Sequence, residues 1–345
     1  MKKKLFLWGG AGAALLLLSA TVSLSLGSAS IPIAHVWGIL LKQIPFAGEY
    51  VPNVWAESSE QIVLKVRLPR ILLGILIGAA LSAAGAGFQG VLRNPLADPY
   101  TLGVASGSSV GAAFLILFGL QYSLFGMWTV PAFAFATGAA TLWVVIRLAG
   151  VQGKFRTETV ILSGVVVSAF LGSIVSLMVA LSDQVVNEIL FWLMGSLALR
   201  GWPYVAVMLP YLAAGAAALV VFGRALNLLA LGERHAAHLG VHVERTKLIV
   251  LLISTLLTAA AVSVSGVVGF VGLITPHLIR MMVGPDYRFI LPLSLLYGGI
   301  YMLWADTLAR MALSPTEIPL GVVTAFLGAP FFAWLLVRQK RTLKS

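Results

Sequence analysis

Three closely spaced histidines are the first residues in this chain whose types and spacing could do chemistry. His235, His238 and His242 stand at i, i+3 and i+7, a spacing that could place three imidazoles on one helix face. Imidazoles are good zinc ligands, but Gly240 interrupts the segment and no carboxylate completes an H-E-x-x-H pattern. We therefore expect a solvated surface here rather than a metal site.

A serine nucleophile and a phosphate-binding loop are the other chemical possibilities. Ser106 and Ser109 lie in a glycine-rich apolar stretch, and His277 could serve as their base only if the fold brought it close. The sequence has no G-x-x-x-x-G-K-[ST] loop for ATP, and its nearest fragment is Gly153-Lys154-Phe155. The chain also has no cysteine. We expect neither a catalytic site nor a cofactor bound by this chain.

The composition indicates the class of protein in which these residues lie. Of the 345 residues, 59% are hydrophobic and 10% are charged, and the mean hydropathy is +0.98. Soluble domains contain about 45–50% apolar and about 25% charged residues. A soluble enzyme, a disordered chain and a nucleic-acid-binding domain are therefore excluded, although the net charge is +11. The chain is an integral membrane protein.

The apolar residues gather in runs that predict an all-α polytopic fold. A membrane-spanning helix needs about 20 apolar residues, and lipid provides no partner for an unpaired backbone group. We expect about ten transmembrane helices, near residues 5–27, 66–90, 97–119, 127–149, 158–181, 203–222, 246–266, 268–283, 289–309 and 318–337.

The basic residues predict the orientation of these helices. Ten spans put both termini on one side, and if that side is the cytoplasm, 17 of the 23 Lys and Arg residues lie in inner loops and tails. This excess satisfies the positive-inside rule. The six that remain outside are Lys42, Lys65, Arg67, Arg70, Arg200 and Arg310.

The first apolar run follows Lys2-Lys3-Lys4 and so imitates a secretory signal peptide. Because it is longer than a typical signal-peptide core and further spans follow, we expect a retained first span. No linker sets off a soluble part. Residues 1–345 are therefore expected to form a single transmembrane domain, with an external segment at about 28–61 and a cytoplasmic segment at about 223–247.

Some short patterns predict local structure. The Gly74-x-x-x-Gly78 spacing lets helices approach closely. Asn94 and Asp98 are expected to cap the turn before the third span. Asp306 and the arginine four residues later are expected to form a pair within one helix. Other ionisable residues are almost missing from the spans, whereas ion-coupled carriers usually keep a relay there. The pathway is thus expected to be driven from outside the chain.

Five sequence blocks, in order between about residues 60 and 337, resemble the FecCD-type permeases of ABC importers for iron-siderophores, haem and vitamin B12. The blocks are Arg67-Leu68-Pro69-Arg70 with Asn94-Pro95-Leu96-Ala97-Asp98-Pro99, Phe191-Trp192-Leu193-Met194-Gly195-Ser196, Gly232-Glu233 with Ala236 and Leu239-Gly240, Gly269-Phe270-Val271-Gly272-Leu273 with Pro276-His277 and Arg280, and Ala305-Asp306 with Arg310, Glu317, Pro319, Gly321 and Gly328-Ala329-Pro330.

The resemblance implies a type II importer architecture in the cytoplasmic membrane of a bacterium or archaeon. It implies a homodimer with the pathway at its interface, two ATPase subunits that use ATP in the cytoplasm, and an external substrate-binding protein. The residues that match the family's ATPase-coupling segment are Gly232, Glu233, Ala236, Leu239 and Gly240. Those that match positions where the binding protein docks are Arg67, Arg70 and Arg310.

For the function, the resemblance implies import by alternating access, without covalent chemistry in this chain. An iron chelate, either a siderophore complex or haem, is the expected substrate because it is the family's commonest. Cobalamin is the alternative, since the block ending in Gly328-Ala329-Pro330 looks much like that of vitamin B12 permeases. A self-sufficient secondary carrier is a distant third hypothesis.

Overall fold

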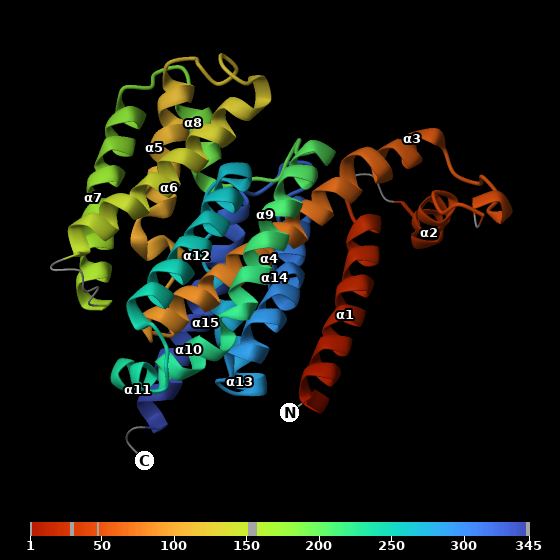
Figure 1. Ribbon diagram of the computed structural model, residues 1–345. Helices are drawn as coiled ribbons and strands as arrows, with labels where there is room; N and C mark the ends of the chain where they lie inside the picture. Colours follow the sequence, from red (N-terminus) through yellow and green to blue (C-terminus); the bar gives the residue numbers. More distant parts are fainter. Residues whose placement is uncertain (1, 28–30, 47, 151–156, 343–345) are drawn as a thin grey trace.

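The computed structural model describes residues 2–27, 31–46, 48–150 and 157–342, which form helices and loops without any strand (Figure 1). One helix corresponds to each of the ten predicted apolar runs, so the predicted all-helical membrane fold is confirmed. These helices are α1 (Lys2–Ser25), α4 (Leu68–Leu92), α5 (Val104–Leu117), α6 (Thr129–Ala149), α7 (Thr157–Ala180), α9 (Trp202–Val221), α12 (Val243–Ser265), α13 (Val271–Val283), α14 (Tyr287–Met311) and α15 (Leu320–Thr342).

Not every one of these helices is long enough to span a bilayer alone. Among the described residues, seven helical stretches have the length and hydropathy of a span. Helix α5 has 14 residues and α13 has 13. The third run was expected from residue 97, but Asp98 caps a short 3₁₀ turn, η3 (Pro99–Leu102), and Gly103 then adopts φ +79°. The α-helix therefore starts only at Val104.

The loops contain further helices that the apolar runs do not predict. The segment before α4 forms α2 (Ile33–Lys42), the turn η1 (Gly48–Tyr50), α3 (Glu57–Gln61) and a π-helical stretch, η2 (Ile62–Arg67), that runs into α4. It projects beside α1 (Figure 1). The others are η4 (Gly126–Trp128), α8 (Val186–Met194), α10 (Gly223–Ala230) and α11 (Glu233–His238).

Helix α4 lies at the centre of the fold, against α9, α12, α13 and α14. Most of α4 is buried inside the protein, whereas most of α1, α7 and α9 faces outward. Helices α5 to α8 form one flank and α1 the other, where it packs along α14 (Figure 1). Any movement of α4 must therefore affect most of the bundle.

Glycines allow this close packing around α4. A Cβ atom on Gly78 would collide with the carbonyl oxygen of Gly298 in α14, and one on Gly298 would lie 2.5 Å from the carbonyl oxygen of Gly78. Farther along α4, a Cβ atom on Gly85 would collide with the Gly272 carbonyl oxygen of α13. The predicted role of Gly78 in close helix packing is confirmed.

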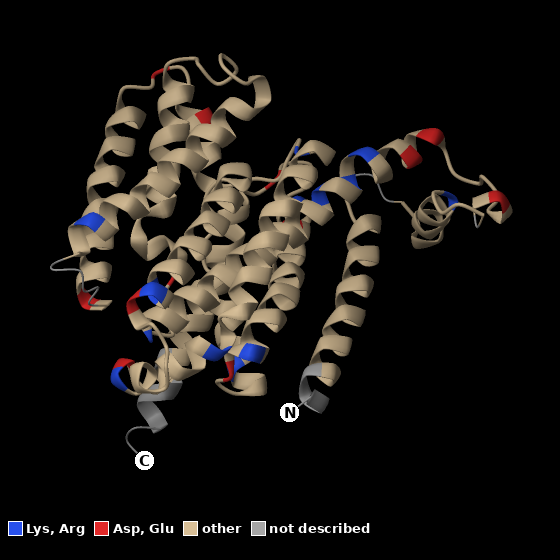
Figure 2. Cartoon of the chain, in the orientation of Figure 1, with Lys and Arg blue, Asp and Glu red and all other residues tan. Residues whose placement is uncertain are grey.

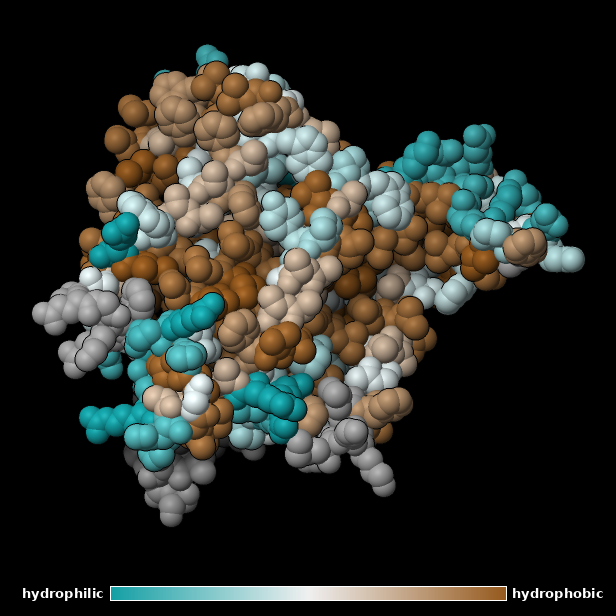
Figure 3. Space-filling view, in the orientation of Figure 1, coloured by the Kyte–Doolittle hydropathy of each residue, from teal (hydrophilic) through white to brown (hydrophobic). Residues whose placement is uncertain are grey.

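The two ends of the bundle differ in what they carry. Helix α1 begins and α15 ends at the same end of the molecule, where α11 also lies (Figure 1). The α2–α3 segment lies at the opposite end. Charged side chains gather near both ends, and the surface between them is largely apolar (Figures 2 and 3). This distribution is that of a protein whose middle lies in lipid.

A glycine substitution tests the contact between α4 and α14. We expect Gly298→Ala to cost about 1–3 kcal/mol, because the added methyl group would collide with the Ser82 side chain and with the Gly78 carbonyl oxygen, both of which belong to the packed helix α4. Gly10→Ala is the control, because a Cβ atom on Gly10 of α1 meets nothing within 4 Å. The midpoint of thermal unfolding in detergent should fall only for Gly298→Ala. Equal midpoints would contradict the close packing.

Candidate functional site

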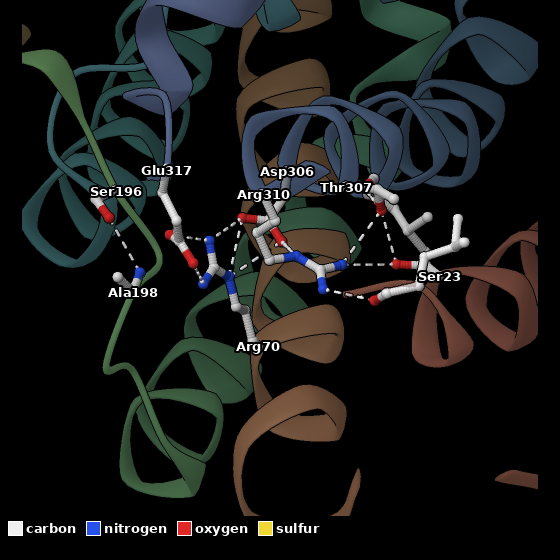
Figure 4. Close-up of polar contacts among 10 residues, drawn as sticks. Ser23, Arg70, Ser196, Ala198, Asp306, Thr307, Arg310 and Glu317 are labelled. Atoms are coloured by element: carbon white, nitrogen blue, oxygen red, sulfur yellow. Dashed lines mark hydrogen bonds and ion pairs between the residues drawn. The ribbon is translucent and has the colours of Figure 1, made fainter. Parts of the chain in front are cut away.

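Four charged side chains form a compact group where α4 begins, here called the Asp306 cluster: Arg70, Asp306, Arg310 and Glu317. Arg70 of α4 donates to both carboxylate oxygens of Asp306 at 2.9–3.1 Å and to Glu317 at 2.8 and 2.9 Å (Figure 4). Asp306 also accepts from Arg310 at 3.1 Å, which confirms the predicted pair within α14. One carboxylate thus joins two guanidinium groups from different helices.

The side chains at the centre of the Asp306 cluster are buried, and Glu317 lies at its exposed edge. The Asp306 side chain is 3% exposed and the Arg70 side chain 11%, whereas Glu317 is 39% exposed. Burial opposes ionisation of Glu317, but its hydrogen bonds to Arg70 and the positive charges nearby outweigh that effect and lower its pKa. Glu317 therefore stays a carboxylate at neutral pH.

Arg310 of this cluster and the neighbouring Arg67 also hold the end of α1. Arg310 donates to the Leu26 carbonyl at 3.1 Å and to the Ser23 hydroxyl at 3.1 Å (Figure 4). Arg67 donates to the Leu24 carbonyl at 2.6 Å and to that of Ser25 at 3.1 Å. The helix end leaves these carbonyl oxygens without partners in its own helix, and the arginines provide them.

The structure brings together all three arginines predicted to meet a binding protein. Arg67, Arg70 and Arg310 line one cavity of about 250 Å³, with Glu317 on its wall. The guanidinium groups of these three arginines also bond to other groups of the chain. They therefore hold the cavity wall together and give it positive charge. Docking of a binding protein at this cavity stays a prediction.

The predicted coupling segment, Gly232–Gly240, lies at the other end of α4. Gly232 has φ +114° and Gly240 has φ +85°, conformations that favour glycine, and they flank the short helix α11. Ala236 is fully buried and anchors α11, while Leu239 is 61% exposed. The segment is therefore anchored to the bundle through Ala236 and exposes the apolar side chain of Leu239.

Glu233 connects this segment to two long helices. Its carboxylate lies 2.7 Å from the Lys247 ammonium of α12 and 3.4 Å from the guanidinium of Arg93, the residue that ends α4. The Lys247 side chain is only 4% exposed. A charge pair with a buried member is hard to separate, because the lysine would stay in the protein interior. Glu233 thus ties α11 to α12 and α4.

A second polar link joins the neighbouring helix α10 to α14. Asn227 donates to Asp286 at 2.6 Å and accepts from the backbone N–H of Tyr287 at 2.7 Å. Hydrogen bonds from Arg288 and Asn227 lower the Asp286 pKa to about 2. The carboxylate therefore stays charged, and this link persists, throughout the neutral range.

The structure places most of the remaining candidates from the sequence. In the described residues, no group of three or more His, Asp or Glu side chains is arranged to hold a metal ion, so His235, His238 and His242 form no such site. No hydrogen bond joins Ser106 or Ser109 to His277 in that part of the chain. The caps are confirmed, because Asn94 accepts from the Leu96 N–H and Asp98 from the Tyr100 N–H. The Gly153-Lys154 fragment lies outside the described residues.

Asp306 and Glu317 contribute unequally to the Asp306 cluster, and paired substitutions test this. We expect Asp306→Asn to destabilise the chain by about 3–5 kcal/mol, since it leaves two buried guanidinium groups without their shared carboxylate. Glu317→Gln is the comparison and should cost about 1 kcal/mol or less, because Glu317 is half-exposed. Thermal unfolding of both variants would measure this, and equal losses would contradict the central role of Asp306.

Similar proteins place this architecture among known transporters. The chain is 43% identical over 331 residues to an uncharacterized ABC transporter permease protein, YvrB, of Bacillus subtilis, covering 96% of this chain and 93% of that one. It is 44% identical over 280 residues to a cobalamin import system permease protein of Halobacterium salinarum (81% and 74% covered). A hemin transport system permease protein of Yersinia pestis is 39% identical over 299 residues (84% and 88% covered).

A solved structure agrees with the sequence relatives over nearly the whole chain. It is described as an inward-facing conformation of a metal-chelate type ABC transporter and superposes with a TM-score of 0.83 at 34% identity, covering 98% of this chain and 100% of that one. A sequence model of the FecCD transport family matches residues 15–338. The chain therefore belongs to the FecCD transport family and is an ABC transporter permease.

Proposed function

We propose that this permease carries an iron chelate, a siderophore complex or haem, into the cell by alternating access. The observation that supports this most is the match to the FecCD family over residues 15–338, together with a structural relative described as of metal-chelate type. The permease supplies the pathway and no covalent chemistry. ATP hydrolysis belongs to its partner subunits.

The working assembly would contain two copies of this chain, two ATPase subunits and an external substrate-binding protein. Both termini and α11 would face the cytoplasm, which agrees with the excess of Lys and Arg expected there. In this orientation α11 offers Leu239 to a groove of the ATPase, with Leu231, also exposed, just before it. The cavity lined by Arg67, Arg70 and Arg310 would face outward and receive acidic residues of the binding protein.

Glu233 would pass the movement of the ATPase to the permease. A push on α11 reaches α12 through Lys247 and α4 through Arg93. Helix α4 has 25 residues, so it extends about 38 Å. Its far end carries Arg70 of the Asp306 cluster. Closure of the ATPase subunits could therefore alter the outer surface through one buried, rigid helix.

The Glu233 link yields a prediction about coupling. We expect Glu233→Gln to lower transport per ATP hydrolysed by up to about 5-fold, because a partly exposed ion pair is worth at most about 1 kcal/mol. Reconstituted vesicles containing the permease with its ATPase would give both rates. Folding is checked by the unfolding midpoint.

Glu244→Gln is the matched control for Glu233→Gln. Glu244 lies 3.8 Å from the same Lys247 ammonium, but both residues belong to α12, so this pair joins no separate elements. Its substitution should leave transport per ATP unchanged. Equal effects of the two variants would contradict transmission through Glu233.

Cobalamin is the alternative substrate, because a relative 44% identical to this chain is named a cobalamin import permease. The rate of ATP hydrolysis by the reconstituted complex of permease, ATPase and binding protein distinguishes an iron chelate from cobalamin as the substrate. We expect a ferric chelate or haem to stimulate hydrolysis and cobalamin to have no effect. Stimulation by cobalamin alone would overturn the iron proposal and leave the importer assignment intact.

A further inference from the structure

One face of helix α2, in the segment that projects beside α1, is both apolar and exposed. Ile33, Trp37 and Leu41 recur at i, i+4 and i+8, which places them on a single face of the helix. Ile44, in the turn that follows α2, extends this row. Each of the four side chains is 40–51% exposed. A continuous apolar surface of this kind marks a contact with another apolar medium or partner.

The opposite face of α2 is packed firmly against the protein. Val36 and Ile39 are fully buried. The Trp55 ring lies against Gly38, where a Cβ atom would collide with it. Trp55 is held in turn, because its Nε1 donates to Glu60 at 3.1 Å. Helix α2 is thus fixed in place, and a helix that is apolar on both faces needs an apolar neighbour on each.

Helix α1 defines the depth of α2 in the membrane. The apolar part of α1 has 20 residues and is therefore about 30 Å long, which equals the thickness of the hydrocarbon core. Leu24 of α1 belongs to one buried apolar cluster with Val36 and Ile39, and Leu16 packs against that cluster. Leu16 and Leu24 lie about 12 Å apart along the helix. Helix α2 therefore lies beside the last turns of α1, at the edge of the hydrocarbon core.

The surface around α2 continues the lipid-facing surface of α1. Only 22% of the apolar part of α1 is buried inside the protein, and Leu17 and Leu18 are largely exposed. In the projecting segment, hydrophobic residues gather on the side toward the middle of the bundle and hydrophilic ones on the side away from the chain termini (Figure 3). The acidic residues of α3 lie on that hydrophilic side (Figure 2).

We propose that α2 is an interfacial helix, inserted through Ile33, Trp37 and Leu41 into the lipid bilayer at the boundary between headgroups and acyl chains. Helices of this kind place Trp and Leu in lipid and their charges in water. In the proposed orientation, with both termini in the cytoplasm, α2 lies in the outer leaflet. The lipid contact then holds the segment that leads through α3 and η2 into α4 at the membrane surface.

The charges of the segment indicate that the acyl chains, and not anionic headgroups, supply the contact. Between residues 28 and 61 the chain has three glutamates and one lysine, Lys42. The Lys42 ammonium lies 5.7 Å from the centre of the Trp55 ring. A segment with a net negative charge is not attracted to anionic lipid. Insertion should therefore be the same in vesicles with and without phosphatidylglycerol.

Nitroxide labels on the full-length chain test the position of α2. The chain has no native cysteine, so Ile33→Cys, Leu41→Cys and, as a control on exposed α3, Ser58→Cys each carry one label. The chain alone is placed in phosphatidylethanolamine vesicles, with or without phosphatidylglycerol. We expect the two α2 labels to collide mainly with oxygen, which concentrates in lipid, and the Ser58 label mainly with a water-soluble nickel chelate. Equal nickel collisions at all three positions would overturn the proposal.

Charged substitutions show whether the apolar face causes the insertion. We expect the double variant Trp37→Glu, Leu41→Glu to raise nickel collisions of the label at Ile33→Cys several-fold, because carboxylates do not enter lipid. Asn53→Glu with Ser58→Glu is the control, since both residues are exposed outside this face. Unfolding midpoints check that both variants fold. Unchanged collisions in the first variant would overturn the role of the face.

A second copy of the chain and the external binding protein are the competing occupants. The vesicles contain no binding protein, so protection of the α2 labels there assigns the face to lipid. Protection that appears only when binding protein is added would overturn the proposal. So would magnetic broadening of the Ile33→Cys label that disappears when the chain is diluted with unlabelled copies, because it would assign the face to the dimer.

The leaflet is measured separately, because it rests on the proposed orientation. A membrane-impermeant maleimide should label Ser58→Cys in intact cells. Failure of this labelling, with the α2 labels still protected by lipid, would contradict the orientation in the proposed function and leave the interfacial helix standing.

Discussion

The structure depends on backbone-to-backbone contact along α4. Gly78 meets Gly298 of α14 and Gly85 meets Gly272 of α13, so two neighbouring helices bring their backbones into contact with that of α4 at these points. In lipid, where the hydrophobic effect does not draw helices together, such contacts supply much of the association energy. Helices α9, α12, α13 and α14 all pack against α4, so a displacement of either of its ends must move its neighbours as well.

Ion pairs connect each end of α4 to other parts of the chain. At one end Asp306 joins Arg70 of α4 to Arg310 of α14, and Arg310 also holds the end of α1. At the other end Arg93 and Lys247 hold Glu233 and hence α11. These pairs connect separate elements, whereas Glu244 and Lys247 pair within one helix. The permease thus has fixed connections where its partners are proposed to act.

The sequence predicted the ten main helices because long apolar runs have only one stable backbone in lipid. It did not predict α8 or α10, whose 9 and 8 residues are too few to stand out from their surroundings. Ion pairs across the fold were also invisible, since Arg70 and Asp306 are 236 residues apart. Lys247 was counted only as a loop charge, although its side chain is buried against Glu233.

The central claim, that Glu233 makes α11 move with the end of α4, is tested most directly by a distance measurement. Spin labels at Leu239 and Leu96, both exposed, would report the separation in the assembled transporter with and without ATP. The account predicts one narrow distribution that shifts by less than about 2 Å between the two states and broadens in Glu233→Gln. A larger shift in the unmodified chain would contradict it.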